Sequence, residues 1–258
     1  MRTFILFILV FLSNCSQVSI DEQADGVRIV SLSPGITASL IDMGFTQQIV
    51  GRSPFCEERT NSIPVVGDLN SINYERLVRL RPTHVFLQNR LAGIDSHLAD
   101  LAKSGAFILR SWELDSVAHI QLLGSELAEI LDVKEPSIDI KLSGLQVSDV
   151  PTLLMTNGSQ QQIGLCFGKN TYLDDLIKEM GGVNALGTSG WSMLSLEDIA
   201  RLAPSRIIIV SDVPFTQNSP VESLDIPVTK FVHKDVLIPS TRIVEVAQAL
   251  HQSMVGQQ

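Results

Sequence analysis

The sequence contains one short pattern twice, and this internal repeat constrains the fold more than any other feature. Residues 75–87 read ERLVRLRPTHVFL, and residues 197–209 read EDIARLAPSRIII. Proline cannot continue a helix and keeps the preceding residue out of the αR region, so each copy predicts a short helix that ends before Pro82 or Pro204. The aliphatic run that follows predicts a strand covered on both faces, as in a parallel sheet.

A second pair of similar segments precedes these two in the chain. Residues 40–44 (LIDMG) and residues 176–181 (LIKEMG) each predict a helix that ends at a glycine suited to the C′ position. Two pairs in the same order indicate two related lobes, and alternating helices and strands indicate right-handed crossovers. We therefore predict an α/β fold with two lobes of mainly parallel sheets, a helical bridge and a ligand cleft between the lobes. The predicted boundaries are 27–114 for the N-lobe, 115–149 for the bridge and 150–258 for the C-lobe.

The same patterns give the individual elements. The expected strands are residues 28–32, 48–51, 84–88, 106–110, 152–156, 206–211 and 228–232. The expected helices are residues 36–43, 74–80, 94–103, 171–180 and 196–202, with a final helix from Ser240. In the bridge, Asp115 is expected to cap a helix that reaches Leu131.

The first residues have the properties of a targeting segment. Residues 4–12 (FILFILVFL) form an apolar run that is too short to span a bilayer core of about 30 Å, which needs roughly 20 helical residues. The run fits a secretory signal. It leads into Leu-Ser-Asn-Cys15, which resembles a bacterial lipobox except that Asn14 replaces the usual small residue. We expect residues 1–15 to be a signal with a lipidated Cys15, and residues 16–26 a tether on the periplasmic side of the cell envelope; the alternative is an ordinary secretory signal with an incidental cysteine.

Charge and motif content disfavour several classes of function. A net charge of −9 disfavours nucleic-acid binding, which needs a basic surface. The chain has no CxxC pair and no nucleotide-binding or nucleophile-elbow motif, and its five histidines are scattered. Asp174 and Asp175 are adjacent in an expected helix, which predicts a solvated face. We therefore expect no enzyme activity, no metal site and no cofactor, and a bare metal ion is a disfavoured ligand. Cys56 and Cys166 form either a disulfide or two buried thiols.

Ligands of parallel α/β lobes bind beyond the carboxyl ends of the strands. The residues expected there as ligand contacts are Ser33, Pro34, Phe55, Cys56, Gln88, Asn89 and Asp212. Trp191 lies in a loop after a glycine, where a large aromatic either fills its own lobe or stacks on a ligand. The loop position alone favours packing inside the lobe.

An ordered set of motifs makes residues 27–251 resemble one known family. The set is RIVSLSP at 28–34, IVG at 49–51, VVG at 65–67 with NYE at 73–75, LRPTHV at 80–85, GGVN at 181–184, residues 191–197, and PSTRI at 239–243. The chain resembles the periplasmic binding proteins that serve ABC importers of cobalamin, ferric siderophores and haem. That resemblance implies a stiff helical connection between the lobes, a largely preformed cleft, and delivery of the ligand to a membrane permease.

Within that family the chain is most similar to the cobalamin-binding branch. By position, Trp191 matches the ligand-stacking tryptophan of the C-lobe and Phe55 matches an aromatic of the N-lobe. Leu69 and Gln88 stand where the branch has two further aromatic residues, which leaves related macrocycles and siderophores open. The family's bridge helix usually has about twenty residues or more, or roughly 30 Å; here Pro136 and Gly144 leave less room.

The resemblance also implies a permease-docking carboxylate on each lobe. Glu75 matches the N-lobe carboxylate, although a glutamate is also favoured at a helix N-terminus by the macrodipole. Asp235 is the candidate of the C-lobe. The expected function is thus a monomeric, lipid-anchored solute-binding protein for a corrinoid or an iron chelate. The alternatives are an enzyme or a ligand-free structural lipoprotein on the same frame.

Overall fold

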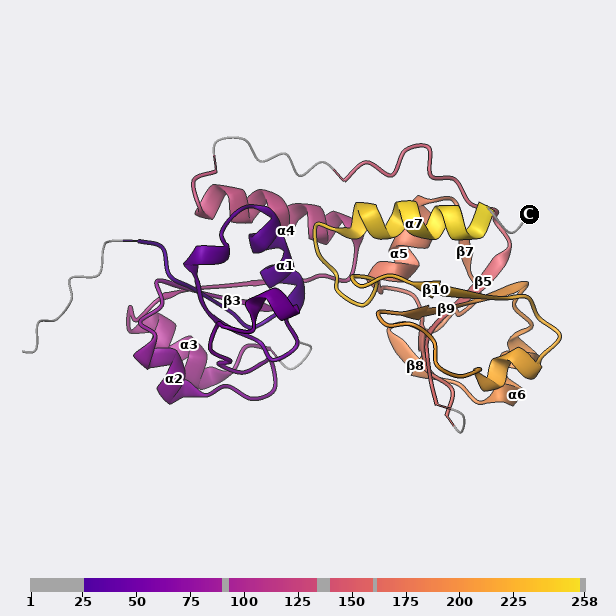
Figure 1. The fold of residues 1–258 in the computed structure, drawn as a ribbon, viewed down its shortest axis with the longest axis horizontal. Helices are drawn as coiled ribbons and strands as arrows, with labels where there is room; N and C mark the ends of the chain where they lie inside the picture. The colour runs from indigo at the N-terminus through magenta and orange to yellow at the C-terminus, as the bar shows by residue number, and fades with distance from the viewer. Residues whose placement is uncertain (1–25, 90–92, 134–139, 160–161, 256–258) are drawn as a thin grey trace, which may run out of the picture.

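The computed structural model describes residues 26–89, 93–133, 140–159 and 162–255, and it contains two α/β lobes side by side (Figure 1). Cys15 and the tether up to Asp25 lie outside the described residues. The N-lobe sheet has the order β2-β1-β3-β4 and is parallel throughout. Its strands are β1 (Ile29–Ser31), β2 (Ile49–Arg52), β3 (His84–Gln88) and β4 (Ile108–Trp112).

The C-lobe sheet has the order β10-β9-β5-β6-β8, with β7 paired to β5. Its strands are β5 (Pro151–Thr156), β6 (Leu165–Phe167), β7 (Val183–Asn184), β8 (Trp191–Met193), β9 (Arg206–Ser211) and β10 (Val228–Val232). Strands β5, β7, β9 and β10 run parallel, whereas β6 and β8 are antiparallel to their neighbours. The predicted two-lobed α/β class is confirmed, and the C-lobe sheet is mixed because two short strands extend its parallel part.

Helices cover both faces of each sheet. In the N-lobe, α1 (Pro34–Asp42) and α4 (Val117–Ile130) lie on one side, and α2 (Tyr74–Arg79) and α3 (Ser96–Lys103) on the other (Figure 1). In the C-lobe, α5 (Tyr172–Glu179) and α7 (Ile243–Val255) lie on one side and α6 (Leu196–Leu202) on the other. The short 3₁₀ turns are η1 (Thr46–Gln48), η2 (Glu58–Thr60) and η3 (Pro220–Ser223).

Alternate strand residues enter different cores, as the pleat of a β-strand requires. Ile29 of β1 and Ile208 of β9 belong to one large cluster shared by α1, α4, α5 and α7, which spans both lobes. Val30 and Ile207 point the opposite way, into separate clusters beneath α2 and α3 or beneath α6. The two lobes therefore share one continuous apolar layer.

The internal repeat is confirmed in its backbone details. Arg81 before Pro82 and Ala203 before Pro204 both adopt the left-handed region, with φ of 46° and 47°. Gly44 and Gly181 close α1 and α5 with φ of 87° and 82°. At each end the glycine N–H donates three residues back and the next N–H donates five residues back, which is the Schellman pattern.

The bridge helix is shorter than the family resemblance implies. Helix α4 has 14 residues, or about 21 Å at 1.5 Å per residue. Its N-cap is Ser116, whose Oγ accepts from the N–H of His119, so the expectation that Asp115 caps the helix is wrong. The Val117 N–H donates to Asp175 Oδ2 of α5 over 2.8 Å, which joins the start of the bridge to the C-lobe. In the described part of the chain, no helix combines the length and hydrophobicity needed to cross a membrane.

Both described cysteines are free thiols. Cys166 is buried in β6, and burial raises the pKa of its thiol to about 11. Cys56 is half-buried, and burial also raises its pKa, although a hydrogen bond with Thr37 opposes the shift. The structure therefore contains two thiols at Cys56 and Cys166 rather than a disulfide.

Candidate functional site

A cavity of about 440 Å³ lies between the lobes, beside the start of the bridge helix. From the N-lobe it receives the residues that follow β3 and β4, and from the C-lobe it receives β8 and the loops before β8 and α5. Its lining is Gln88, Asn89, Glu113, Leu114, Asp115, Asn170, Ser189, Gly190 and Trp191. This position agrees with binding at the carboxyl ends of parallel strands for β3 and β4.

Trp191 forms the aromatic wall of this cavity. Its relative exposure is 49%, so it does not fill the core of its own lobe as its loop position suggested. Trp191 begins β8 and pairs with Phe167 of β6, whose ring centroid lies 4.1 Å from that of Trp191. Because Phe167 is fully buried, it supports one side of the indole and leaves the other part exposed. A half-exposed indole with a rigid support is suited to stacking on a ligand with a broad apolar face.

Buried hydrogen bonds behind Trp191 hold this aromatic wall in place. Asn184 Nδ2 donates both to the Phe167 carbonyl and to Asp174 Oδ1, each over 2.9 Å. Asp174 has 1% exposure and also accepts from Lys178 Nζ at 2.6 Å and from the backbone of Asn170, which lines the cavity. The expected solvated face is therefore wrong for Asp174, because the adjacent carboxylates diverge toward two different interior partners.

The bridge end of the cavity is acidic. Glu113 and Asp115 both line it, and both face His119 in the first turn of α4. His119 Nδ1 lies 2.5 Å from Asp115 Oδ1, and Nε2 lies 3.8 Å from Glu113 Oε2. These three residues form a histidine–carboxylate cluster that sequence spacing missed, although Asp115 and His119 are four residues apart across a helix start. The preceding strand was predicted to end at residue 110, but it ends at Trp112. Glu113 was therefore not recognised as a residue at the end of a strand.

The structure brings three of the expected ligand residues together, namely Gln88, Asn89 and Trp191. The others lie elsewhere. Ser33 is buried at the N-cap of α1 with Pro34 as the first helical residue, and Leu69 packs beside the core under α2. Cys56 packs against Thr37, Phe55 is 67% exposed in the loop after β2, and Asp212 is exposed after β9.

The two docking candidates lie in different environments. Glu75 is in the first turn of α2, its side chain is 86% exposed, and it pairs with Arg79 at 3.5 Å. Asp235 is 3% exposed, and Lys234 and Arg242 bind its carboxylate. The expectation that Asp235 offers a docking carboxylate therefore does not fit its position, because a buried and paired carboxylate is not presented to a partner.

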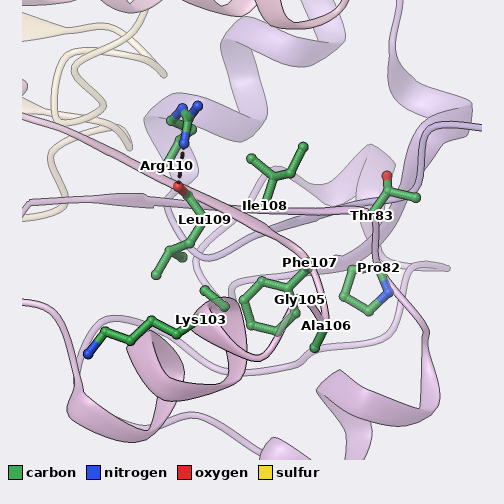
Figure 2. A pocket seen from close by; sticks show the side chains of 10 residues that line it. Pro82, Thr83, Lys103, Gly105, Ala106, Phe107, Ile108, Leu109 and Arg110 are labelled. Atoms are coloured by element: carbon green, nitrogen blue, oxygen red, sulfur yellow. Dashed lines mark hydrogen bonds between the residues drawn. The ribbon is translucent and has the colours of Figure 1, made fainter.

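A larger groove of about 730 Å³ lies at the other end of the N-lobe strands (Figure 2). It is lined by residues 82–83 before β3 and by residues 102–103 and 105–110 around the start of β4. It is open along the edge strand and contains none of the expected ligand residues. The cavity between the lobes is therefore the better candidate site.

Residues 29–135 match the sequence model of a family described as periplasmic binding protein. The matched segment is less than half of the chain. It covers the N-lobe and the bridge helix. A search of curated proteins gives no match.

Solved structures of periplasmic binding proteins share the two-lobed fold over most of this chain. The haem-binding protein BhuT in complex with two haems is 18% identical, with 89% of this chain and 98% of that chain covered and a TM-score of 0.74. The apo haem-binding protein RhuT from Roseiflexus sp. RS-1 is 18% identical, with 90% and 98% covered and a TM-score of 0.70. The vitamin B12-binding protein BtuF of Vibrio cholerae is 14% identical, with 90% and 98% covered and a TM-score of 0.65.

Proposed function

We propose that the chain is the solute-binding component of an ABC importer and that it captures a corrinoid or an iron chelate, such as haem or a ferric siderophore, between its lobes. The observation that carries this proposal is the supported indole of Trp191 in a cavity that both lobes line. The structural neighbours that bind haem and vitamin B12 support the same class of ligand. The chain acts on the periplasmic side of the envelope, and lipidation of Cys15 anchors it to the membrane as a monomer.

The chemistry of the cavity is consistent with a metal-bearing macrocycle. An aromatic wall contacts the broad apolar face of such a ligand, and the amides of Gln88, Asn89 and Asn170 can hydrogen-bond to polar groups at its rim. Phe55, which is highly exposed on the N-lobe, is a further candidate contact. A preformed cavity of this kind binds without ordering large segments, so little conformational entropy is lost.

A titration of the mature chain from Ser16 tests this function. Cyanocobalamin, cobinamide, haem and a ferric hydroxamate siderophore are each added while tryptophan fluorescence is recorded. We expect saturable quenching with one ligand per chain for at least one of them, and recovery of that ligand chemically unchanged. Absence of saturable binding by the whole panel would remove the proposed function, and conversion of a ligand would favour an enzyme.

We further propose that Glu75 meets the permease. Its exposed carboxylate can pair with an arginine of a partner, and such pairs set orientation and association rate more than affinity. Glu75→Lys is expected to reduce ligand uptake by cells carrying the variant while ligand affinity stays unchanged. Glu129→Lys on the exposed side of α4 is the matched control and should support normal uptake. Equal uptake by both variants would contradict the docking role.

A further inference from the structure

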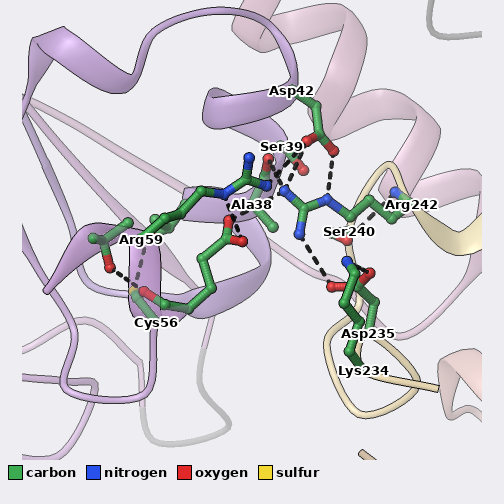
Figure 3. A network of polar contacts seen from close by, with 12 residues as sticks. Ala38, Ser39, Asp42, Cys56, Arg59, Lys234, Asp235, Ser240 and Arg242 are labelled. Carbon is green, nitrogen blue, oxygen red and sulfur yellow. Dashed lines mark hydrogen bonds and ion pairs between the residues drawn. The ribbon is translucent and has the colours of Figure 1, made fainter. Parts of the chain in front are cut away.

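Arg242 of the C-lobe reaches across to the N-lobe (Figure 3). It precedes α7, and its side chain is 5% exposed. Its guanidinium binds Asp42 of α1 through two bonds of 2.7 Å and Glu57 through one bond of 3.1 Å. A third carboxylate, Asp235 of its own lobe, accepts from Nη1 at 3.1 Å. One planar side chain thus binds carboxylates from both lobes, as the guanidinium fork permits.

The charges in this network balance. Asp42, Glu57 and Asp235 supply three carboxylates, and Arg242, Arg59 and Lys234 supply three cations. The paired Asp42 carboxylate, together with Glu57 and Asp235, raises the pKa of Arg242 above its ordinary value. Burial opposes ionisation of Asp235, yet Lys234 and Arg242 hold its pKa below its usual range. Both shifts favour the charged forms of Arg242 and Asp235. Of the three cations, only Arg242 connects the lobes.

Backbone contacts beside this network show how closely the lobes meet. A Cβ placed on Gly35 of α1 would lie 2.1 Å from the carbonyl oxygen of Pro239. The N–H of Thr241 donates to Ser39 Oγ over 3.2 Å. Gly35, Ser39 and Asp42 lie on one face of α1, since residues three and four apart are neighbours on a helix. The segment that carries Arg242 therefore packs directly on α1.

The network also reaches a loop with a candidate ligand contact. Glu57 follows Phe55 by two residues, in the loop after β2. Arg59 Nε binds the second carboxylate oxygen of Glu57 at 2.7 Å, so Glu57 is held from both lobes. Cys56 between them contacts Thr37 Oγ1 at 3.2 Å. A movement of Arg242 relative to α1 would therefore be transmitted to the loop that presents Phe55.

We propose that Arg242 is a positioning residue of the ligand site, which fixes the Phe55 loop of the N-lobe relative to the Trp191 wall of the C-lobe. This inference rests on the proposed function for its ligand contacts, but not for the lobe arrangement itself. Without Arg242, the shared apolar layer still joins the lobes, but the loop and the wall are no longer held at one separation. Only part of the population is then competent to bind, and the apparent affinity falls by that fraction.

Distances between spin labels on the two lobes test this inference in the full mature chain. Labels enter through noncanonical residues at Lys103 of α3 and Arg201 of α6, whose side chains are 78% and 74% exposed, so the native cysteines are kept. We expect a narrow distance distribution for the wild type and a broadened one for Arg242→Met. Arg242→Lys should be intermediate, because an ammonium cannot make the paired bonds to Asp42. Lys234→Met is the matched control, since it removes a cation of the same network that does not cross between the lobes.

The same variants are titrated with the ligand that the wild type binds. Arg242→Met is expected to bind about tenfold more weakly if about a tenth of the population stays competent. Glu57→Gln should weaken binding while the distance distribution stays narrow, because it releases only the Phe55 loop. This variant also tests the role of the network in ligand binding if Arg242→Met fails to fold. A narrow distribution for Arg242→Met, or equal broadening for Lys234→Met, would overturn the inference. A wild type that binds no ligand would refute the proposed function, while the distances would still decide whether Arg242 holds the lobes.

Discussion

Replacement of Trp191 by alanine is expected to weaken ligand binding about tenfold or more. A tryptophan that becomes buried by its partner on binding commonly contributes about 2 kcal/mol or above to the binding free energy, and about 1.4 kcal/mol corresponds to a tenfold change in affinity. The reason is the support of the indole by Phe167, whose ring lies 4.1 Å away, so that stacking costs little side-chain ordering. Calorimetry measures the affinity, because the variant keeps only the buried Trp112 as a tryptophan fluorophore.

Two further variants make the Trp191 result specific. Trp191→Phe should retain most of the affinity, because it keeps an aromatic face. Leu122→Ala on α4 changes a residue of the same 49% exposure outside the cavity and should have no effect on binding. Unchanged affinity in Trp191→Ala would show that the ligand does not contact this wall.

Replacement of Asp174 by alanine is expected to lower the free energy of unfolding by about 2–4 kcal/mol, since it removes a charged acceptor from a buried network. Asn184 and the Asn170 N–H each lose a partner, while Lys178 is half-exposed and returns to water. Urea unfolding followed by circular dichroism measures the change. The loss should also weaken ligand binding, because Asn184 holds the Phe167 carbonyl behind Trp191.

The matched control for Asp174 is Glu179→Ala at the end of the same helix. Glu179 is exposed, so its replacement should change the free energy of unfolding by less than about 0.5 kcal/mol. Equal urea midpoints of unfolding for the two variants would contradict the buried network. Such a result would instead favour a solvated position for Asp174, as the sequence suggested.

Local signals predicted the repeated elements well. The proline after α2 and α6 and the glycine after α1 and α5 act on the backbone of their own neighbourhood, so their effect is readable from adjacent residues. Strands β6 and β8 were missed because each has three residues, which is too short for an alternating pattern to be recognised. Their absence from the prediction left Trp191 in a loop, although it starts an antiparallel strand.

Long-range polar contacts were not predictable in the same way. Arg242 lies 200 residues from Asp42 and 185 from Glu57, and no spacing rule connects them. Their meeting depends on how the two lobes pack, which the individual elements do not specify. Asp235 is likewise buried and paired with both Lys234 and Arg242, which its own stretch of sequence did not indicate. The end of a predicted strand pointed to Gln88 and Asn89, and the family resemblance pointed to Trp191; these three candidates line the cavity between the lobes.

One ligand is proposed to lie between the lobes against Trp191, and a crystal structure of the mature chain with the ligand identified by titration would locate it. We expect the apolar face of the ligand to lie against the indole of Trp191, with Gln88 and Asn89 within hydrogen-bond distance of its rim. A ligand seated in the groove beside β4, or anywhere with contacts to only one lobe, would contradict it.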